Sequence, residues 1–180
     1  CVTGKPINKN GLPGREEATG RGIQYIAREF YKNSDLLEEF GLSKNLENKT
    51  LIVQGLGNVG YHASKFLTED ENVKLIGIAE YNGGIYNENG INVEHAKKFF
   101  TKNKSFKNYT KAKFIKDGAL VIKKECDIVI PAARENVITE KNAGSVKAKL
   151  IIEAANGPIS YTANKMLNKM NIFVIPDILA

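Results

Sequence analysis

Short, largely apolar runs alternate along this chain with longer segments of helical periodicity. The apolar runs fall within residues 51–53, 73–79, 127–131, 149–153 and 172–175. Strands that are apolar on both faces are typical of a parallel sheet covered by helices on each side. Their alternation with helices indicates the α/β class. The pattern therefore predicts a doubly wound, mostly parallel sheet with helices on both faces.

The first part of the chain has a different pattern. Glycine and proline punctuate residues 1–14, as in a loop. Residues 15–40 repeat apolar positions at helical spacing, and we expect a helix there that breaks near residues 33–34. Residues 1–45 are thus expected to lead into the domain. Two glycines within residues 19–22 each cost up to about 1 kcal/mol in a helix, so we expect another backbone or a ligand to come close.

Further helices are predicted between the apolar runs. Asn92 is suited to cap a helix that runs to about residue 102, and Thr139 is suited to cap another. Residues 162–170 follow the same periodicity. The short apolar pieces at 113–115 and 120–122 are compatible with either strand or helix.

A glycine-rich motif, residues 54–60, joins the first apolar run to a helical segment. Gly55 permits a tight turn, Gly57 allows a close approach of a pyrophosphate, and Gly60 allows close helix–strand packing. Glu80 follows at the end of the next apolar run, 20 residues after Gly60, where a carboxylate can accept hydrogen bonds from ribose hydroxyls. This order indicates a Rossmann-like dinucleotide site. The alternatives are a merely structural turn and, for Glu80, an ordinary exposed carboxylate.

Two further clusters of small residues follow later strands, at residues 131–134 and 154–157. In doubly wound sheets, ligands bind at the carboxyl ends of the strands. Asn156 can both donate a hydrogen bond to a carboxamide and accept one from it. The alternative, which its spacing alone favours, is that Asn156 is a turn residue before Gly-Pro.

The composition of the 180 residues is 42% hydrophobic and 26% charged, as in a globular domain of ordinary size. No apolar run approaches the roughly twenty residues that cross a bilayer. The two cysteines, Cys1 and Cys126, form neither a disulfide framework nor a metal motif, so we expect a reducing compartment and no metal. Because the chain begins with Cys1 rather than Met, we expect a segment of a longer protein.

The net charge of +6 is concentrated in one stretch, since residues 97–116 hold eight lysines and no Asp or Glu. Such a run is conceivable as a nucleic-acid patch. The stretch contains no arginine and no recognised binding motif, so a solvated surface is the favoured interpretation. We expect neither nucleic acid nor a membrane as a partner.

Several ordered motifs together resemble the cofactor-binding half of glutamate dehydrogenases, in the Glu/Leu/Phe/Val dehydrogenase family. They lie at residues 3–6, 14–15, 18–22, 54–60, 127–133, 153–158 and 174–177, and thus span essentially the whole chain. The resemblance implies cofactor-binding positions at Thr19, Gln54, Gly55, Leu56, Gly57, Asn58, Val59, Gly60, Glu80, Tyr81, Ala132, Ala133, Ala155 and Asn156. It also implies that Arg15 faces the substrate side.

The resemblance assigns separate roles along the cofactor. Thr19 and Asn156 would serve the nicotinamide end, residues 57–59 the pyrophosphate, and Glu80 the adenosine ribose. Ala132 and Ala133 would form the adenine-side and nicotinamide-side walls of the cofactor pocket. A departure is Ala154, where many members carry glycine. The bulk of Tyr81 beside the Glu80 carboxylate favours NAD over NADP, although NADP is possible.

The resemblance implies reversible NAD(P)-dependent oxidative deamination of L-glutamate to 2-oxoglutarate and ammonia. The family's catalytic lysine and aspartate belong to a substrate domain that we do not find in these 180 residues. We therefore expect one dinucleotide-binding domain over residues 1–180, with no catalytic residue, that binds cofactor without turning over alone. The parent protein is expected to be a homo-oligomer, a hexamer by analogy, in the cytoplasm or mitochondrial matrix.

Other functions stay open at this point. A leucine- or phenylalanine-type dehydrogenase has the same architecture, and the pocket that would decide between them lies mostly outside this chain. A non-catalytic dinucleotide-sensing module is a second alternative. The third is nucleic-acid binding through the lysines of residues 97–116.

Overall fold

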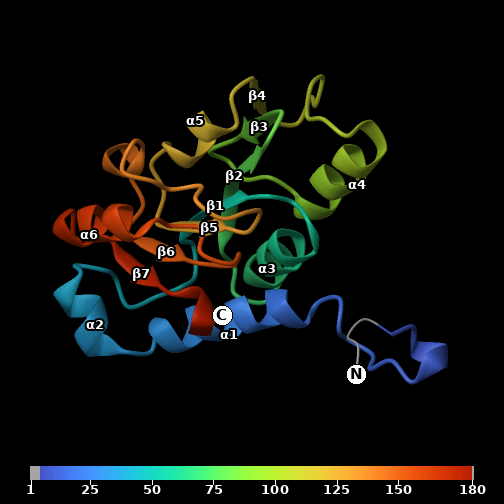
Figure 1. Cartoon of the computed structure of the whole chain (residues 1–180). Coiled ribbons are helices and arrows are strands. Elements are labelled where there is room, and N and C mark those ends of the chain that lie inside the picture. The colour runs from blue at the N-terminus through green and yellow to red at the C-terminus, as the bar shows by residue number, and fades with distance from the viewer. Residues whose placement is uncertain (1–4, 180) are drawn as a thin grey trace.

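The computed structural model describes residues 5–179 and contains one seven-stranded sheet (Figure 1). The strand order is β4-β3-β2-β1-β5-β6-β7. The strands are β1 Thr50–Gln54, β2 Lys74–Glu80, β3 Gly83–Tyr86, β4 Lys113–Ile115, β5 Ile128–Pro131, β6 Leu150–Ile152 and β7 Phe173–Ile175. All neighbours are parallel except the pairs β2–β3 and β3–β4. The predicted mostly parallel α/β sheet is confirmed.

Helices cover both faces of this sheet (Figure 1). They are α1 Ala18–Phe30, α2 Ser34–Glu39, α3 Asn58–Glu69, α4 Val93–Asn103, α5 Ala119–Ile122 and α6 Tyr161–Lys169, with 3-10 turns η1 Ile7–Lys9, η2 Ala143–Ser145 and η3 Asp177–Leu179. Leu51 and Val53 of β1 pack in the core under α1 to α4, whereas Ile52 packs in the core under α5 and α6. The apolar runs are therefore buried on both faces, as their lack of alternation predicts.

Local signals fix several helix starts. The Asn92 side chain accepts a hydrogen bond from the His95 amide and caps α4, as predicted. The break expected near residues 33–34 is present, because the Asn33 side chain caps a separate helix, α2. The first long helix begins at Ala18 rather than Arg15, since residues 13–17 form turns.

The helix expected after Thr139 does not form, and only the short turn η2 follows it. The reason lies in Asn142, whose side chain accepts a hydrogen bond from the Thr139 amide at 2.8 Å and donates one to the Val137 carbonyl at 2.8 Å. These bonds satisfy the backbone in a turn and compete with the helix. The ambiguous apolar pieces divide, since residues 113–115 form β4 and 120–122 lie in α5.

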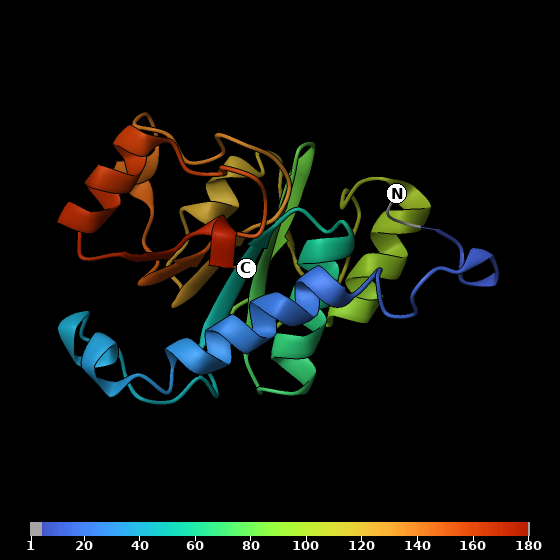
Figure 2. The ribbon, with the colours of Figure 1, turned by 60° about the horizontal axis from the view of Figure 1, so that its bottom comes forward.

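Helix α1 lies across α3 (Figure 2). A Cβ on Gly20 would come within 2.5 Å of His62 Cβ, so the predicted close approach of another backbone is confirmed. Polar contacts also tie α1 to the two residues that follow α3, since Arg21 reaches Asp70 at 2.7 Å and Arg28 pairs with Glu71. This packing sets the position of the α1 N-terminus beside that of α3.

Within residues 5–179, no helix is long and apolar enough to cross a membrane. The same residues hold no group of three or more His, Cys, Asp or Glu arranged to bind a metal ion. Cys1 and the first motif residues Thr3 and Gly4 lie outside the described part of the chain.

Candidate functional site

The glycine turn after β1 is tightly packed at two of its glycines and open at the third. Gly55 has φ +89°, and a Cβ there would come within 2.8 Å of Ala133 Cβ. Gly60 packs against the Gly55 carbonyl. A Cβ on Gly57 would instead meet no atom of residues 5–179 within 4 Å. No atom of the described residues therefore requires a glycine at position 57, whereas a ligand that approaches the backbone there would.

The N-terminus of α3 is available to an anion. Gly57 is the N-cap residue of α3, and Gly57 and Asn58 are both exposed. The first turn of α3 contains no acidic residue. The first N–H groups of a helix have no intrahelical partner and carry a partial positive charge. Asn58 and Val59 begin this turn, which suits them to hold phosphate oxygens through their amides.

Glu80 closes the other side of the glycine turn. Its Oε1 accepts a hydrogen bond of 2.6 Å from the Leu56 amide. The side chain is only partly exposed, so Glu80 is not the ordinary exposed carboxylate of the alternative interpretation. Tyr81, next along the chain, is 85% exposed and free to lie against a ligand.

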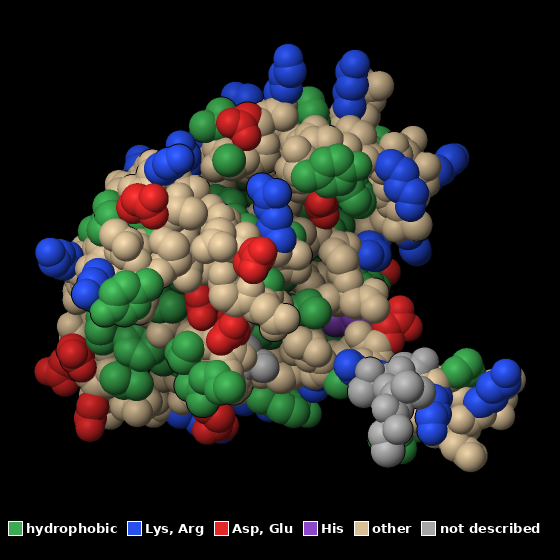
Figure 3. Space-filling view, in the orientation of Figure 1, with side chains coloured by type: hydrophobic (Ala, Val, Ile, Leu, Met, Phe, Trp, Pro, Cys, Tyr) green, Lys and Arg blue, Asp and Glu red, His purple; other side chains and the backbone are tan. Residues whose placement is uncertain are grey.

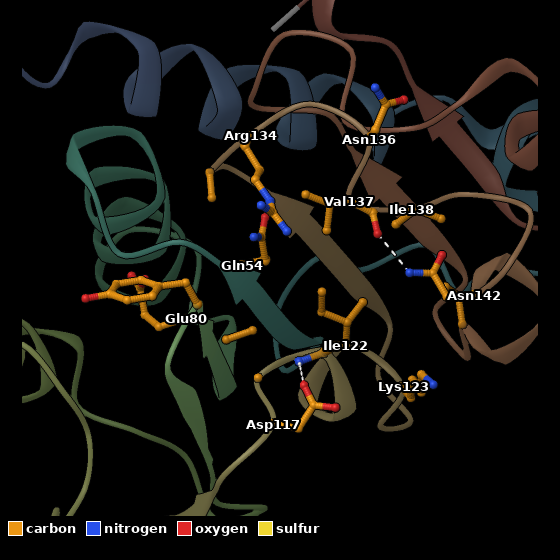
Figure 4. A pocket seen from close by; sticks show the side chains of 16 residues that line it. Gln54, Glu80, Asp117, Ile122, Lys123, Arg134, Asn136, Val137, Ile138 and Asn142 are labelled. Atoms are coloured by element: carbon orange, nitrogen blue, oxygen red, sulfur yellow. Dashed lines mark hydrogen bonds between the residues drawn. The ribbon is translucent and has the colours of Figure 1, made fainter.

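A central cavity of about 410 Å³ lies beside Glu80 (Figure 4). It is lined by the ends of β1 and β2, by residues 117–123 and by the loop after β5, with Gln54, Ala79, Glu80, Tyr81, Asp117, Gly118, Ala119, Ile122, Lys123, Ala133, Arg134, Asn136, Val137, Ile138, Asn142 and Val146. Four of the predicted cofactor positions meet here: Gln54, Glu80, Tyr81 and Ala133. The cavity therefore joins segments that lie far apart in the sequence.

Two polar side chains at this cavity, Gln54 and Arg134, are able to hydrogen-bond a ligand. Gln54 Oε1 is buried and has no hydrogen-bond partner among residues 5–179. Arg134 is exposed and points from the loop after β5 toward Gln54 (Figure 4). A buried acceptor without a partner is costly unless a water molecule or a ligand satisfies it. Arg134 was within a cluster that the sequence singled out, but the sequence assigned it no role.

A second space, the N-terminal cavity, measures about 680 Å³ and lies between the segment before α1 and the start of α3. It brings together Arg15, Thr19, Asn58 and Val59, and its lining also includes Lys5, Pro6, Ile7, Leu12, Gly14 and Glu16. The predicted nicotinamide and substrate-side residues thus lie next to the predicted pyrophosphate residues.

The loop after β6 stands apart from these cavities. Asn156 is exposed, and Ala132, Ala155 and Asn156 line neither of the two spaces. Gly157 has φ +51°, and its amide donates to Asp177 Oδ2 at 2.8 Å, which pins the turn. The structure therefore shows the turn that the alternative for Asn156 expects, and its cofactor role stays a prediction.

Lys97 is a residue that sequence reasoning missed. Seven of the eight lysines in residues 97–116 are exposed, as a solvated surface predicts. Lys and Arg side chains project along the upper edge of the molecule in Figure 3. Lys97 is half-buried instead, and its Nζ donates a hydrogen bond of 2.7 Å to the Leu56 carbonyl. Burial lowers the pKa of Lys97, while the Glu80 carboxylate opposes that shift.

The chain is similar in sequence to several curated glutamate dehydrogenases. The mitochondrial glutamate dehydrogenase of Dictyostelium discoideum is 42% identical over 99% of this chain and 36% of its own length. The catabolic NAD-specific glutamate dehydrogenase RocG of Bacillus subtilis is 37% identical, and an NADP-specific glutamate dehydrogenase of Saccharolobus shibatae is 40% identical, each over 99% of this chain and 40% of its own length. The chain thus spans about two fifths of the curated relatives it matches.

Solved structures show the same relationship. The hetero-hexameric glutamate dehydrogenase of Thermus thermophilus, in a leucine-bound form, superposes with a TM-score of 0.81 at 26% identity, over 98% of this chain and 39% of that one. The family model for Glutamate/Leucine/Phenylalanine/Valine dehydrogenase matches residues 11–180. The chain therefore belongs to the glutamate/leucine/phenylalanine/valine dehydrogenase family.

Proposed function

We propose that residues 1–180 are the single dinucleotide-binding domain of a glutamate dehydrogenase. The parent enzyme would be an oxidoreductase that catalyses reversible oxidative deamination of L-glutamate to 2-oxoglutarate and ammonia with NAD, or with NADP. The named relatives are glutamate dehydrogenases with 37–42% identity, which favours glutamate over leucine or phenylalanine. The observation that carries the proposal is the Glu80 carboxylate, hydrogen-bonded to the Leu56 amide beside an open helix N-terminus.

The residues present fit a dinucleotide at several points. Gly57 leaves open space where a pyrophosphate would approach, and the unpaired Gln54 Oε1 can accept a hydrogen bond from a ligand in the central cavity. Glu80 would hold the ribose hydroxyls through its second oxygen while Oε1 keeps its bond to the glycine turn. Arg15 and Thr19 would face the nicotinamide and substrate side of the N-terminal cavity.

The bound cofactor would accept a hydride from the substrate α-carbon. The protein groups described here would hold it in place and would exchange no proton with the substrate. The acid–base residues are proposed to belong to the part of the parent protein that this chain does not cover, since the chain covers 36–40% of the relatives' lengths. We therefore propose that the chain alone binds dinucleotide without turnover.

The assembly and the compartment of the parent protein are also proposals. The glutamate dehydrogenase of Thermus thermophilus is a hetero-hexamer, which supports an assembly of six subunits. For the parent of this chain we propose that the six subunits are identical. The Dictyostelium relative is named as mitochondrial, and another relative is bacterial. Both support a cytoplasmic or mitochondrial matrix location with reduced cysteines.

A calorimetric titration of the chain with NAD⁺, ADP-ribose and nicotinamide mononucleotide tests the proposal. ADP-ribose contains the adenosine and pyrophosphate that the glycine turn and Glu80 would hold, so it should bind nearly as well as NAD⁺. Nicotinamide mononucleotide should bind much more weakly. Absence of binding by both NAD⁺ and ADP-ribose would overturn the proposal.

The substrate is tested on the full-length parent protein. Initial rates with glutamate, leucine and phenylalanine should favour glutamate. A preference for leucine or phenylalanine would leave the cofactor site intact and replace the proposed substrate. No rate with any of the three, in a protein that binds NAD⁺, would favour a dinucleotide-sensing module.

A further inference from the structure

The backbone of Leu56 in the glycine turn is bound by charged side chains at both its amide and its carbonyl. Its amide donates to Glu80 Oε1 at 2.6 Å, and its carbonyl accepts from Lys97 Nζ at 2.7 Å. Leu56 itself is only 2% exposed. Lys97 comes from α4, so its contact spans 41 residues of sequence. The ammonium and the carboxylate thus flank one turn of backbone at the site where the cofactor would bind.

The Lys97 ammonium forms no close ion pair within residues 5–179. No carboxylate in residues 5–179 lies within 4.0 Å of Nζ. Glu94, three residues earlier on the same helix, is engaged by Lys65 at 2.8 Å and by the Tyr61 hydroxyl. Lys97 Nζ lies 5.2 Å from the centre of the Tyr61 ring, which also favours the charged form.

This arrangement changes what the Glu80 carboxylate does to a cofactor. A carboxylate beside the ribose repels the 2′-phosphate that distinguishes NADP from NAD. A nearby ammonium in a partly buried setting offsets that repulsion, because screening by water is weak there. Its attraction for the pyrophosphate is common to both cofactors and so does not affect the choice between them.

We propose that Lys97 is a specificity-determining residue: its ammonium offsets the Glu80 carboxylate, so the ribose site accepts a 2′-phosphorylated dinucleotide as well as NAD. The inference rests on the proposed function, since it concerns the same cofactor site. It assigns the acceptance of NADP to a lysine on α4 that acts together with the acid at the end of β2.

The test is the ratio of NADP⁺ to NAD⁺ affinity, measured by calorimetry on the chain and its Lys97→Met variant. Loss of the hydrogen bond to the Leu56 carbonyl lowers the affinity for both cofactors, so this effect cancels in the ratio. Loss of the charge should lower the ratio about tenfold, which corresponds to about 1.4 kcal/mol. Lys97→Arg should keep most of the ratio.

Lys98→Met is the matched control, because it removes an equal charge from an exposed neighbour on α4. It should leave the ratio within about twofold of the unmodified chain, well below the tenfold effect at Lys97. Lys97→Gln, a polar neutral variant, provides a second measurement if Lys97→Met does not give a cooperative thermal unfolding transition.

The outcomes separate the inference from the proposed function. An unmodified chain that binds neither cofactor overturns the proposed function, and the inference with it. Equal weakening of NAD⁺ and NADP⁺ in Lys97→Met and Lys97→Gln overturns the inference alone, since Lys97 would then only brace the turn. An equal fall of the ratio in Lys98→Met would also overturn it, since net charge would then be the cause.

Discussion

Gly60 lies so close to Gly55 that a Cβ on Gly60 would come within 1.9 Å of the Gly55 carbonyl oxygen. The clash would be with backbone, which a rotamer change cannot relieve. The first turn of α3 is therefore held at a fixed distance from the end of β1, and the unpaired amides of that turn are held with it. The same motif contains Gly57, whose environment is open, so the two glycines separate the roles of packing and binding.

Gly60→Ala should destabilise the fold. Overpacking against backbone typically costs up to about 3 kcal/mol, and urea unfolding followed by circular dichroism would measure it. Gly144→Ala is the matched control, because a Cβ there meets no atom of the part of the chain that the structure describes within 4 Å. The control should change the free energy of unfolding by less than about 0.5 kcal/mol. Similar stability in both variants would contradict the packing described for Gly60.

Gly57→Ala should leave the stability of the fold unchanged and weaken the binding of NAD⁺. Gly57 has φ −69°, which any residue adopts, so the free energy of unfolding should stay within about 0.5 kcal/mol of the original. The added methyl group would stand where the pyrophosphate approaches the backbone, so NAD⁺ affinity should fall at least about tenfold, or 1.4 kcal/mol. Calorimetry and urea unfolding on the same preparation check both parts. Unchanged NAD⁺ affinity would remove Gly57 from the binding surface.

The parts of this molecule that the sequence predicts well depend on local causes. Apolar runs without alternation must be buried on both faces, which leads to a covered parallel sheet. The tight turn at Gly55 follows from the motif itself. Gly20 predicts a close contact, because a glycine inside a helix is unfavourable on its own. The contact is with His62.

The parts that the sequence did not predict depend on tertiary contacts. Lys97 is one of eight lysines in its stretch, and only the rotation of α4 against the glycine turn makes it differ from Lys98. The orientation of Arg134 toward the central cavity depends on the loop after β5. Thr139 resembles a helix cap in sequence, but the bonds made by Asn142 decide for a turn.

The start of β1 should make the stability of the fold depend on acid pH. Asp127 Oδ2 accepts hydrogen bonds from the Thr50 amide at 2.9 Å and the Thr50 hydroxyl at 2.8 Å. Burial opposes ionisation of Asp127, but these bonds and the Lys149 ammonium outweigh it and hold the pKa below its ordinary value of 3.8. The folded-state pKa is thus lower than the unfolded one. The stabilisation is therefore present above about pH 3.8 and is lost as the pH falls through the folded-state pKa.

Thr50→Val tests this contact, because it removes the hydroxyl and keeps the shape. Hydrogen bonds to charged groups contribute about 1.5–3 kcal/mol, so the variant should lose about that much at pH 7. The loss should shrink once Asp127 is protonated in both states. Urea unfolding between pH 7 and pH 2 measures it, with the exposed Thr101→Val as control. A loss that is the same at every pH would show that the ionised Asp127 is not the partner that matters.

Glu80→Gln should raise the affinity for NADP⁺ relative to NAD⁺. Glutamine keeps an oxygen that can accept from the Leu56 amide, so the glycine turn should stay in place while the negative charge is lost. Removing a carboxylate beside the ribose relieves repulsion of a 2′-phosphate, and the NADP⁺ to NAD⁺ ratio should increase about tenfold, or 1.4 kcal/mol. Glu88→Gln, at an exposed residue, is the charge-matched control and should leave the ratio unchanged.

In Glu80→Ala the Leu56 amide loses its acceptor, so both cofactors should bind more weakly than in Glu80→Gln. A ratio that stays constant in Glu80→Gln would mean that the carboxylate holds the turn without selecting the cofactor.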